Sequence, residues 1–116
     1  MSTARTDYVE LWSSGNPEMK AFYETAFGWR FTDYADTYCG FEDGVREGEA
    51  GGFNANGPRT EPLVVLYADD IEAARAGVLK AGGELVGDDV EFPGGKRFAF
   101  RDPSGNLLAV WTKSES

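Results

Sequence analysis

The chain has 116 residues, a net charge of −9, one cysteine and no histidine. This length suits a single domain with a hydrophobic core. The absence of histidine excludes imidazole acid–base pairs and histidine metal sites. The basic residues are few and scattered, which argues against nucleic-acid binding, and a lone Cys39 excludes an internal disulfide. No apolar run could span a bilayer and the N-terminus does not resemble a secretory signal, so we expect a cytoplasmic protein with no membrane partner.

Apolar residues at helical spacing predict two helices, each ended by glycine. The first is expected over 16–27, with Asn16 as its N-cap and Gly28 after its last turn. The second is expected over about 70–81, with Asp69 or Asp70 as its N-cap and a Gly-Gly pair after it. Their inner faces are predicted to be Met19, Phe22, Tyr23, Ala26 and Phe27 in the first helix, and Ile71, Ala74, Val78 and Leu79 in the second.

Alternating or apolar segments bounded by turn residues predict the strands. In chain order they are 8–12, 30–34, 37–42, 45–53, 63–67, 84–86 with a possible extension to 92, 97–101 and 107–112. The order strand, helix, three strands therefore occurs twice, which predicts an α+β fold. We expect one domain in which module one covers about 6–53, a linker about 54–61, and module two about 62–113. Two such modules would pair and leave a cleft between them.

Three segments in this order resemble the vicinal oxygen chelate superfamily, which includes glyoxalase I, extradiol dioxygenases and bleomycin resistance proteins. The segments are AFYETAFGWRF at 21–31, DDIEAARAGVLKAGGEL at 69–85 and FRDPSGNLLAVW at 100–111. The resemblance implies paired βαβββ modules that form a curved sheet cup, a ligand held in that cup, and a homodimer.

The resemblance also allows the family's four metal-ligand positions to be placed in this sequence. Three of them fall on Tyr8, Leu63 and Ala109, and the fourth falls around 49–51. Leu63 and Ala109 have no donor atom in their side chains, and a tyrosine phenol is an unusual ligand near neutral pH. We therefore expect no metal site and no cofactor.

Strand alternation then predicts which side chains line the cup, because residues two apart share a face. The predicted ligand-binding residues are Tyr8, Glu10, Trp12, Leu63, Tyr67, Ala109 and Trp111. Tyr38 and Phe53 are further lining candidates, although a shift of one residue in register would turn them away. Trp29 and Cys39 are interpreted as core residues.

Glu10 is the most conspicuous charge on this predicted surface. Beside aromatic rings it could bind a cationic ligand or act as a general acid or base, and alternatively it could lie solvated at the rim or paired with an arginine. Tyr8 could be a hydrogen-bonding or proton-donating phenol, or a packing residue. Glu10 and Tyr8 are thus the two candidate catalytic residues.

Three functions stay open from the sequence. The first is a metal-free protein that binds and sequesters a small aromatic or cationic molecule, such as an antibiotic or toxin. The second is a metal-independent lyase, isomerase or hydrolase that uses Glu10 and Tyr8. The third is a scaffold or regulatory subunit whose own side chains fill the cup.

Overall fold

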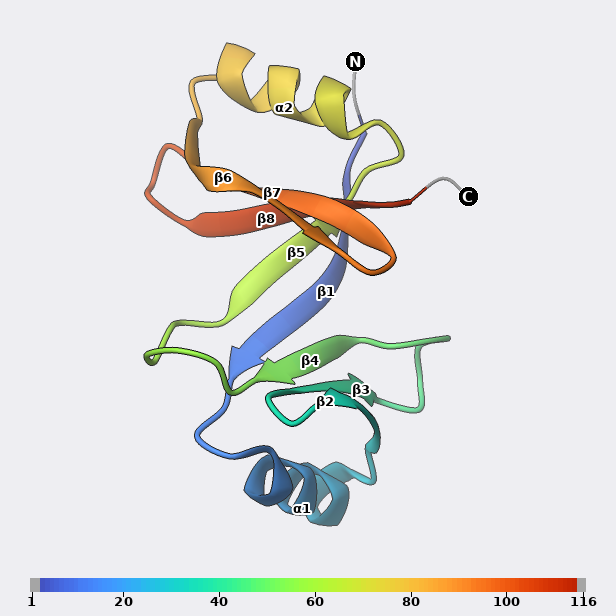
Figure 1. Cartoon of the computed structure of the whole chain (residues 1–116). Coiled ribbons are helices and arrows are strands. Elements are labelled where there is room, and N and C mark those ends of the chain that lie inside the picture. The colour runs from blue at the N-terminus through green and yellow to red at the C-terminus, as the bar shows by residue number, and fades with distance from the viewer. Residues whose placement is uncertain (1–2, 115–116) are drawn as a thin grey trace. The chain divides into compact units, whose positions relative to one another are not determined.

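A computed structural model describes residues 3–114 of the chain, in which eight strands and two helices form an α+β fold (Figure 1). The contacts divide these residues into two compact units. The N-terminal unit is Tyr8–Leu63, and the C-terminal unit combines the described residues up to Asp7 with those from Val64 onward. The element order strand, helix, three strands occurs twice, as the sequence predicts.

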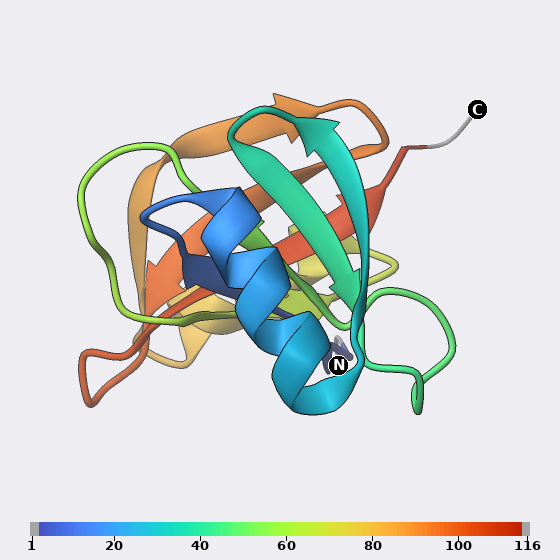
Figure 2. The ribbon, with the colours of Figure 1, turned by 90° about the horizontal axis from the view of Figure 1, so that it is seen from below.

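The N-terminal unit is a mixed sheet with one helix. Its elements are most of β1 (Arg5–Trp12), α1 (Asn16–Phe27), β2 (Arg30–Ala35), β3 (Tyr38–Glu42) and β4 (Gly51–Asn54). The strand order is β2–β3–β4–β1, in which β4 pairs with β1 in parallel and the other two pairs are antiparallel. Figure 2 shows α1 in front of the strands of its own unit.

The C-terminal unit repeats this arrangement. Its elements are the start of β1, β5 (Leu63–Tyr67), α2 (Ile71–Lys80), β6 (Glu84–Phe92), β7 (Gly95–Arg101) and β8 (Leu107–Lys113). The strand order here is β5–β8–β7–β6, with β5 and β8 parallel and the other pairs antiparallel. The strand predicted over 84–86 extends to residue 92, as the longer alternative allowed.

Each helix covers an apolar face of its own sheet. Cys39, Phe41 and Phe53 form the buried core of the N-terminal unit, with partly buried side chains of β1, β2 and α1 around them. In the C-terminal unit the core side chains come from the segment around α2 and from β7 and β8, and they are Ala68, Ile71, Ala74, Phe98 and Val110. Alternate side chains of each strand point away from the helix, to the opposite face of the sheet.

The start of the first helix differs from the prediction. Gly15, and not Asn16, occupies the N-cap position, and no side chain caps this end. Asn16 is the first helical residue, and its amide group is buried with no hydrogen-bond partner among the described residues. The second helix is capped as predicted, since the Asp70 carboxylate accepts a hydrogen bond from the Ala73 N–H at 3.0 Å. Gly28 ends the first helix with a left-handed φ of 72°.

Two further predictions are wrong. Residues 45–50 are not a strand, because Gly44 and Gly48 both adopt a left-handed φ and bend the chain. The predicted inner faces of the helices are also too broad. Phe22, Phe27 and Leu79 are more than half exposed, because each sheet contacts a narrower stripe of its helix. Among residues 3–114, no helix is long and apolar enough to cross a membrane.

Candidate functional site

Two glycines form the floor of the candidate site in the N-terminal unit. Gly40 of β3 and Gly52 of β4 lie opposite each other in an antiparallel pair, and both are buried. A Cβ atom added to Gly52 would lie 2.3 Å from the Tyr8 hydroxyl and 2.4 Å from the Tyr38 hydroxyl. A Cβ atom added to Gly40 would lie 2.1 Å from the Glu49 carboxylate. Polar groups therefore lie directly against the sheet backbone at these two glycines. Any residue other than glycine would place its side chain in the same space.

The phenols of Tyr8 and Tyr38 meet above this floor. Tyr8 belongs to β1 and Tyr38 to β3, and their hydroxyl oxygens are 2.5 Å apart. They approach each other because the strand between them, β4, carries Gly52 at this point. Tyr38 thus lies on the predicted ligand-facing side. Phe53, the other candidate of the same kind, points to the opposite side and belongs to the core.

A third phenol, that of Tyr34, bonds to the Glu49 carboxylate beside this pair. The Tyr34 hydroxyl donates a hydrogen bond of 2.5 Å to Glu49 Oε2, and the rings of Tyr34 and Tyr38 are 6.5 Å apart. Tyr34 is exposed, whereas Glu49 is half-buried in the segment before β4. Among the described residues no lysine or arginine forms an ion pair with Glu49. The Glu49 carboxylate therefore accepts a hydrogen bond from a phenol and is otherwise in contact with solvent.

Glu10 lies next to these groups on β1. It pairs with Gly52 in register, it is half-buried, and one of its carboxylate oxygens is 3.5 Å from the side-chain nitrogen of Asn54. Together with burial, which is the larger cause, its negative charge raises the pKa of both Tyr8 and Tyr38. We call Tyr8, Glu10, Tyr34, Tyr38 and Glu49 together the tyrosine–glutamate cluster.

The surroundings hold all three phenols of the cluster in the protonated form. Burial is the largest cause that raises the pKa of Tyr8 and of Tyr38, and the nearby carboxylates raise both further. The hydrogen bond to Glu49 is the largest cause that raises the pKa of Tyr34 to about 12. The phenols are therefore hydrogen-bond donors at neutral pH, and none of them is ready to act as a base.

Tyr8 and Tyr38 share one short hydrogen bond, in which either hydroxyl can be the donor. Beyond the effect of burial, the Glu10 carboxylate lies close enough to raise the pKa of both phenols. The arrangement thus places a pair of protonated phenols beside a carboxylate.

The other predicted residues of the N-terminal unit lie at its edges. Trp12 is on the same side of β1 as Glu10, two residues further along, and its indole N–H donates to the Gly57 carbonyl oxygen at 3.2 Å. Leu63 is the first residue of β5 and is half-buried.

The remaining predicted residues lie in the C-terminal unit. Tyr67 and Trp111 pair in register and their rings meet edge to face at 4.8 Å. Ala109 is almost fully buried on the same side of β8 as Trp111. The Trp111 indole N–H donates to Asp7 Oδ2 at 2.9 Å, and the Arg5 guanidinium lies over the Tyr67 ring. Tyr67 is buried at 6 % exposure, so these groups are largely engaged with one another.

Sequence reasoning missed Tyr34 and considered Glu49 only as a metal-ligand position. The alternation Thr32, Tyr34 in β2 does place Tyr34 on the side away from the core, which is a signal that could have found it. Glu49 carries no comparable signal, because it lies in a bent segment and not in a strand.

The residues at the family's metal-ligand positions do not fit a divalent ion. Leu63 and Ala109 offer no donor, and the pKa of the Tyr8 phenol is raised, so that Tyr8 stays protonated. Glu49 remains as a single carboxylate in this set. Within residues 3–114 no group of three or more carboxylate, thiol or imidazole side chains is placed to hold a metal ion.

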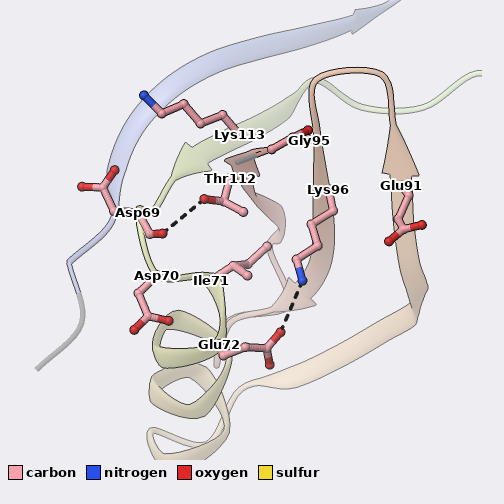
Figure 3. A pocket seen from close by; sticks show the side chains of 10 residues that line it. Asp69, Asp70, Ile71, Glu72, Glu91, Gly95, Lys96, Thr112 and Lys113 are labelled. Carbon is pink, nitrogen blue, oxygen red and sulfur yellow. Dashed lines mark hydrogen bonds and ion pairs between the residues drawn. The ribbon is translucent and has the colours of Figure 1, made fainter. Parts of the chain in front are cut away.

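A separate concave region lies in the C-terminal unit, between the start of α2 and the ends of β7 and β8 (Figure 3). Its volume is about 630 Å³. Some of its charged groups are already engaged, since Lys96 Nζ is 3.9 Å from Glu72 Oε2 and the Asp70 carboxylate caps the helix. The tyrosine–glutamate cluster brings two half-buried carboxylates and three protonated phenols together, and it is our candidate for ligand binding.

Comparison with known proteins supports the family resemblance. The sequence profile of the Glyoxalase/Bleomycin resistance protein/Dioxygenase superfamily matches residues 5–110. No curated protein matches the chain.

Solved structures share the fold. A Mn(II)-bound glyoxalase from Novosphingobium aromaticivorans is 22% identical with a TM-score of 0.66, and the match covers 100% of this chain but 43% of that one. The chain thus spans less than half the length of that relative. Methylmalonyl-CoA epimerase from Mycobacterium tuberculosis is 10% identical with a TM-score of 0.71, covering 96% of this chain and 89% of that one. A superfamily member from Vibrio splendidus is 13% identical with a TM-score of 0.67, covering 97% and 100%.

Proposed function

The chain belongs to the glyoxalase/bleomycin resistance protein/dioxygenase superfamily, and within it we propose a metal-independent protein that binds a small aromatic or cationic molecule at the tyrosine–glutamate cluster. The observation that carries the proposal is the chemistry of this cluster. Two carboxylates and three protonated phenols lie together above a glycine floor. Sequestration of an antibiotic or toxin is one use of such a site.

The charges favour a cation. Glu49 has a phenol as its donor and no basic partner among the described residues, so a ligand ammonium group would add a charge-assisted hydrogen bond there. The aromatic rings beside it attract a cation through their faces. A net charge of −9 would also raise the rate at which cations reach the protein.

The experiment is a titration of tryptophan fluorescence against a panel of aromatic cations and planar antibiotics, with Trp12 as the reporter. We expect Glu49→Gln and Glu10→Gln to weaken binding of a cationic ligand by about tenfold or more, because a hydrogen bond to a charged group contributes about 1.5–3 kcal/mol. Glu24→Gln, on the exposed side of α1, makes the same change in net charge and serves as the control. Equal affinity in all variants would refute the site.

Metal independence is part of this proposal. Its support is the donor set, in which Leu63 and Ala109 stand at two of the ligand positions that the family resemblance implies. Metal analysis of the purified protein and a ligand titration in the presence of a chelator test it. A tightly bound stoichiometric divalent ion, or loss of binding in the chelator, would contradict it.

A second candidate function is a metal-independent lyase, isomerase or hydrolase. The paired hydroxyls of Tyr8 and Tyr38 beside the Glu10 carboxylate favour it, because a protonated phenol can donate a hydrogen bond to a reacting group and a carboxylate can accept a proton. Methylmalonyl-CoA epimerases are among the proteins of similar fold. Chemical analysis of the ligand after incubation separates the two functions, since sequestration returns it unchanged and an enzyme consumes it. If no compound binds, the remaining hypothesis is a scaffold or regulatory subunit whose own side chains fill the cup.

We also propose a homodimer in the cytoplasm. Strand β6 lies at an edge of the sheet and carries four exposed apolar side chains, Leu85, Val86, Val90 and Phe92, which a second copy could cover. Sedimentation analysis over a range of concentrations tests this point, and a monomer at all concentrations would contradict it.

A further inference from the structure

The loop between β4 and β5 turns back over the end of β1 and is attached there to Trp12. The indole N–H of Trp12 donates to the Gly57 carbonyl oxygen at 3.2 Å. The guanidinium of Arg59 lies over the same indole, 5.6 Å from the ring centre. At the start of the loop the Asn56 N–H donates to the Asn54 side chain at 2.9 Å. The contacts of Gly57 and Arg59 thus attach the loop to β1, while the Asn54–Asn56 bond fixes the turn that begins it.

Arg59 carries a positive charge that forms no ion pair with a described residue, and its side chain is exposed. The Arg59 guanidinium lies over the face of the Trp12 ring. This contact orients the guanidinium without neutralising its charge. A planar guanidinium held in this way can bind a carboxylate with two hydrogen bonds.

Arg59 lies close enough to the tyrosine–glutamate cluster for one ligand to contact both. Trp12 follows Glu10 by two residues on the same side of β1, which places their side chains about 7 Å apart along the strand. The Arg59 guanidinium is one further step away, on the Trp12 ring. The surface therefore carries carboxylates at the cluster, a guanidinium at Arg59, and the Trp12 ring between them.

We infer that Arg59 determines specificity at this site, and that the preferred ligand is an aromatic zwitterion with its two charges at opposite ends of a ring. The ammonium group of such a ligand contacts Glu10 and Glu49, its ring packs on Trp12, and its carboxylate meets Arg59. This inference rests on the proposed function, because it requires cation binding at the cluster. An α-amino acid, whose charges share one carbon, fits this spacing less well.

The test compares two probes that differ by one carboxylate. Benzylamine carries the ring and the cation, and 4-(aminomethyl)benzoate adds a carboxylate across the ring. Isothermal titration calorimetry gives the ratio of their affinities. We expect the unaltered protein to prefer the zwitterion by about tenfold, the effect of one hydrogen-bonded charge pair.

The variants then locate the source of the preference. In Arg59→Gln we expect the affinity ratio to fall to about one, and in Arg59→Lys we expect part of the preference to remain because the charge remains. Lys80→Gln, at the end of α2, makes the same change in net charge and should keep the full ratio. A ratio of one in the unaltered protein, or an unchanged ratio in Arg59→Gln, would overturn the inference while benzylamine binding upholds the proposed function. If neither probe binds, the proposed function fails and the inference with it.

Discussion

Gly40 of β3 and Gly52 of β4 face each other across an antiparallel pair, and the polar groups of the site occupy the space above both. Neither glycine has a positive φ, so backbone conformation does not require glycine at either position. At Gly52 the lack of space requires it, because a Cβ atom would collide with the phenols of Tyr8 and Tyr38. At Gly40 a Cβ atom would displace the Glu49 carboxylate, which is the end of a flexible side chain. The positions of the phenols and of the Glu49 carboxylate therefore depend on the absence of side chains at Gly52 and Gly40.

Gly52→Ala should disrupt the site and leave the fold in place. The new Cβ would lie 2.3 Å and 2.4 Å from the hydroxyls of Tyr8 and Tyr38, so both phenols must move and their mutual hydrogen bond is lost. We expect the free energy of unfolding to fall by about 1–3 kcal/mol, as overpacking does, and ligand affinity to fall with it. Urea denaturation and calorimetric titration measure the two effects.

Gly15→Ala is the matched control for this substitution. Gly15 has an extended φ of 177°, and a Cβ there would meet nothing within 4 Å. The expected cost is that of alanine at an N-cap, about 1 kcal/mol in the free energy of unfolding, with no effect on the shape of the site. Equal ligand affinity in the two variants would show that Gly52 has no role in shaping the site.

Much of the fold follows from local sequence. The first helix begins at Asn16 and ends at Phe27 as predicted, because an apolar stripe ends at a glycine that adopts the left-handed conformation. The segment 45–50 differs from the strand that the sequence predicts over 45–53. Its conformation is set instead by Gly44 and Gly48 and by the Asp43 carboxylate, which accepts hydrogen bonds from two N–H groups that follow it.

The site could be predicted only in part. Alternation along β1 places Tyr8, Glu10 and Trp12 on one side, and the structure agrees, since Leu11 packs in the core. The meeting of Tyr8 with Tyr38 could not be predicted, because it depends on the register of three strands that are distant in sequence. The position of Glu49 over Gly40 depends on the same register.

The protonated phenols predict a loss of stability at high pH. The pKa of Tyr34 is raised from 10.0 to about 12, mainly by its hydrogen bond to Glu49. Because the folded pKa exceeds the unfolded one, the contribution of this group is complete below pH 10 and is lost as the pH rises toward about 12. Urea denaturation at a series of pH values should show this decline, and tyrosinate absorbance should show late ionisation.

Tyr34→Phe tests the assignment of this titration. The variant lacks the phenol that bonds to Glu49, so it should lose one late-ionising tyrosine and part of the decline in stability above pH 10. Tyr8 and Tyr38 should still ionise late, because burial is the main cause that raises each pKa. An absorbance titration identical to that of the unaltered protein would contradict the Tyr34–Glu49 bond.

Cys39 should be unreactive in the folded protein. Its side chain is fully buried in the core of the N-terminal unit, and burial, followed by a hydrogen bond with Asp33, raises the pKa of its thiol to about 11. The thiolate that attacks an alkylating reagent is therefore scarce at neutral pH. Mass spectrometry after iodoacetamide treatment should find the folded protein unmodified and the urea-unfolded protein modified. Comparable rates in both states would contradict the position of Cys39.

Arg75 should contribute more to the stability of the C-terminal unit than other surface cations. Its guanidinium bonds to both carboxylate oxygens of Asp89 at 2.9 Å and 2.5 Å, and it lies 4.7 Å from the centre of the Phe98 ring. It thereby joins α2 to β6 and covers a core side chain. Arg75→Lys keeps the charge but loses the two parallel bonds and the planar contact, so we expect a loss of about 1 kcal/mol in the free energy of unfolding. Lys80→Arg, on the exposed end of the same helix, should change it little, and equal effects in the two variants would mean that the geometry of Arg75 adds nothing beyond its charge.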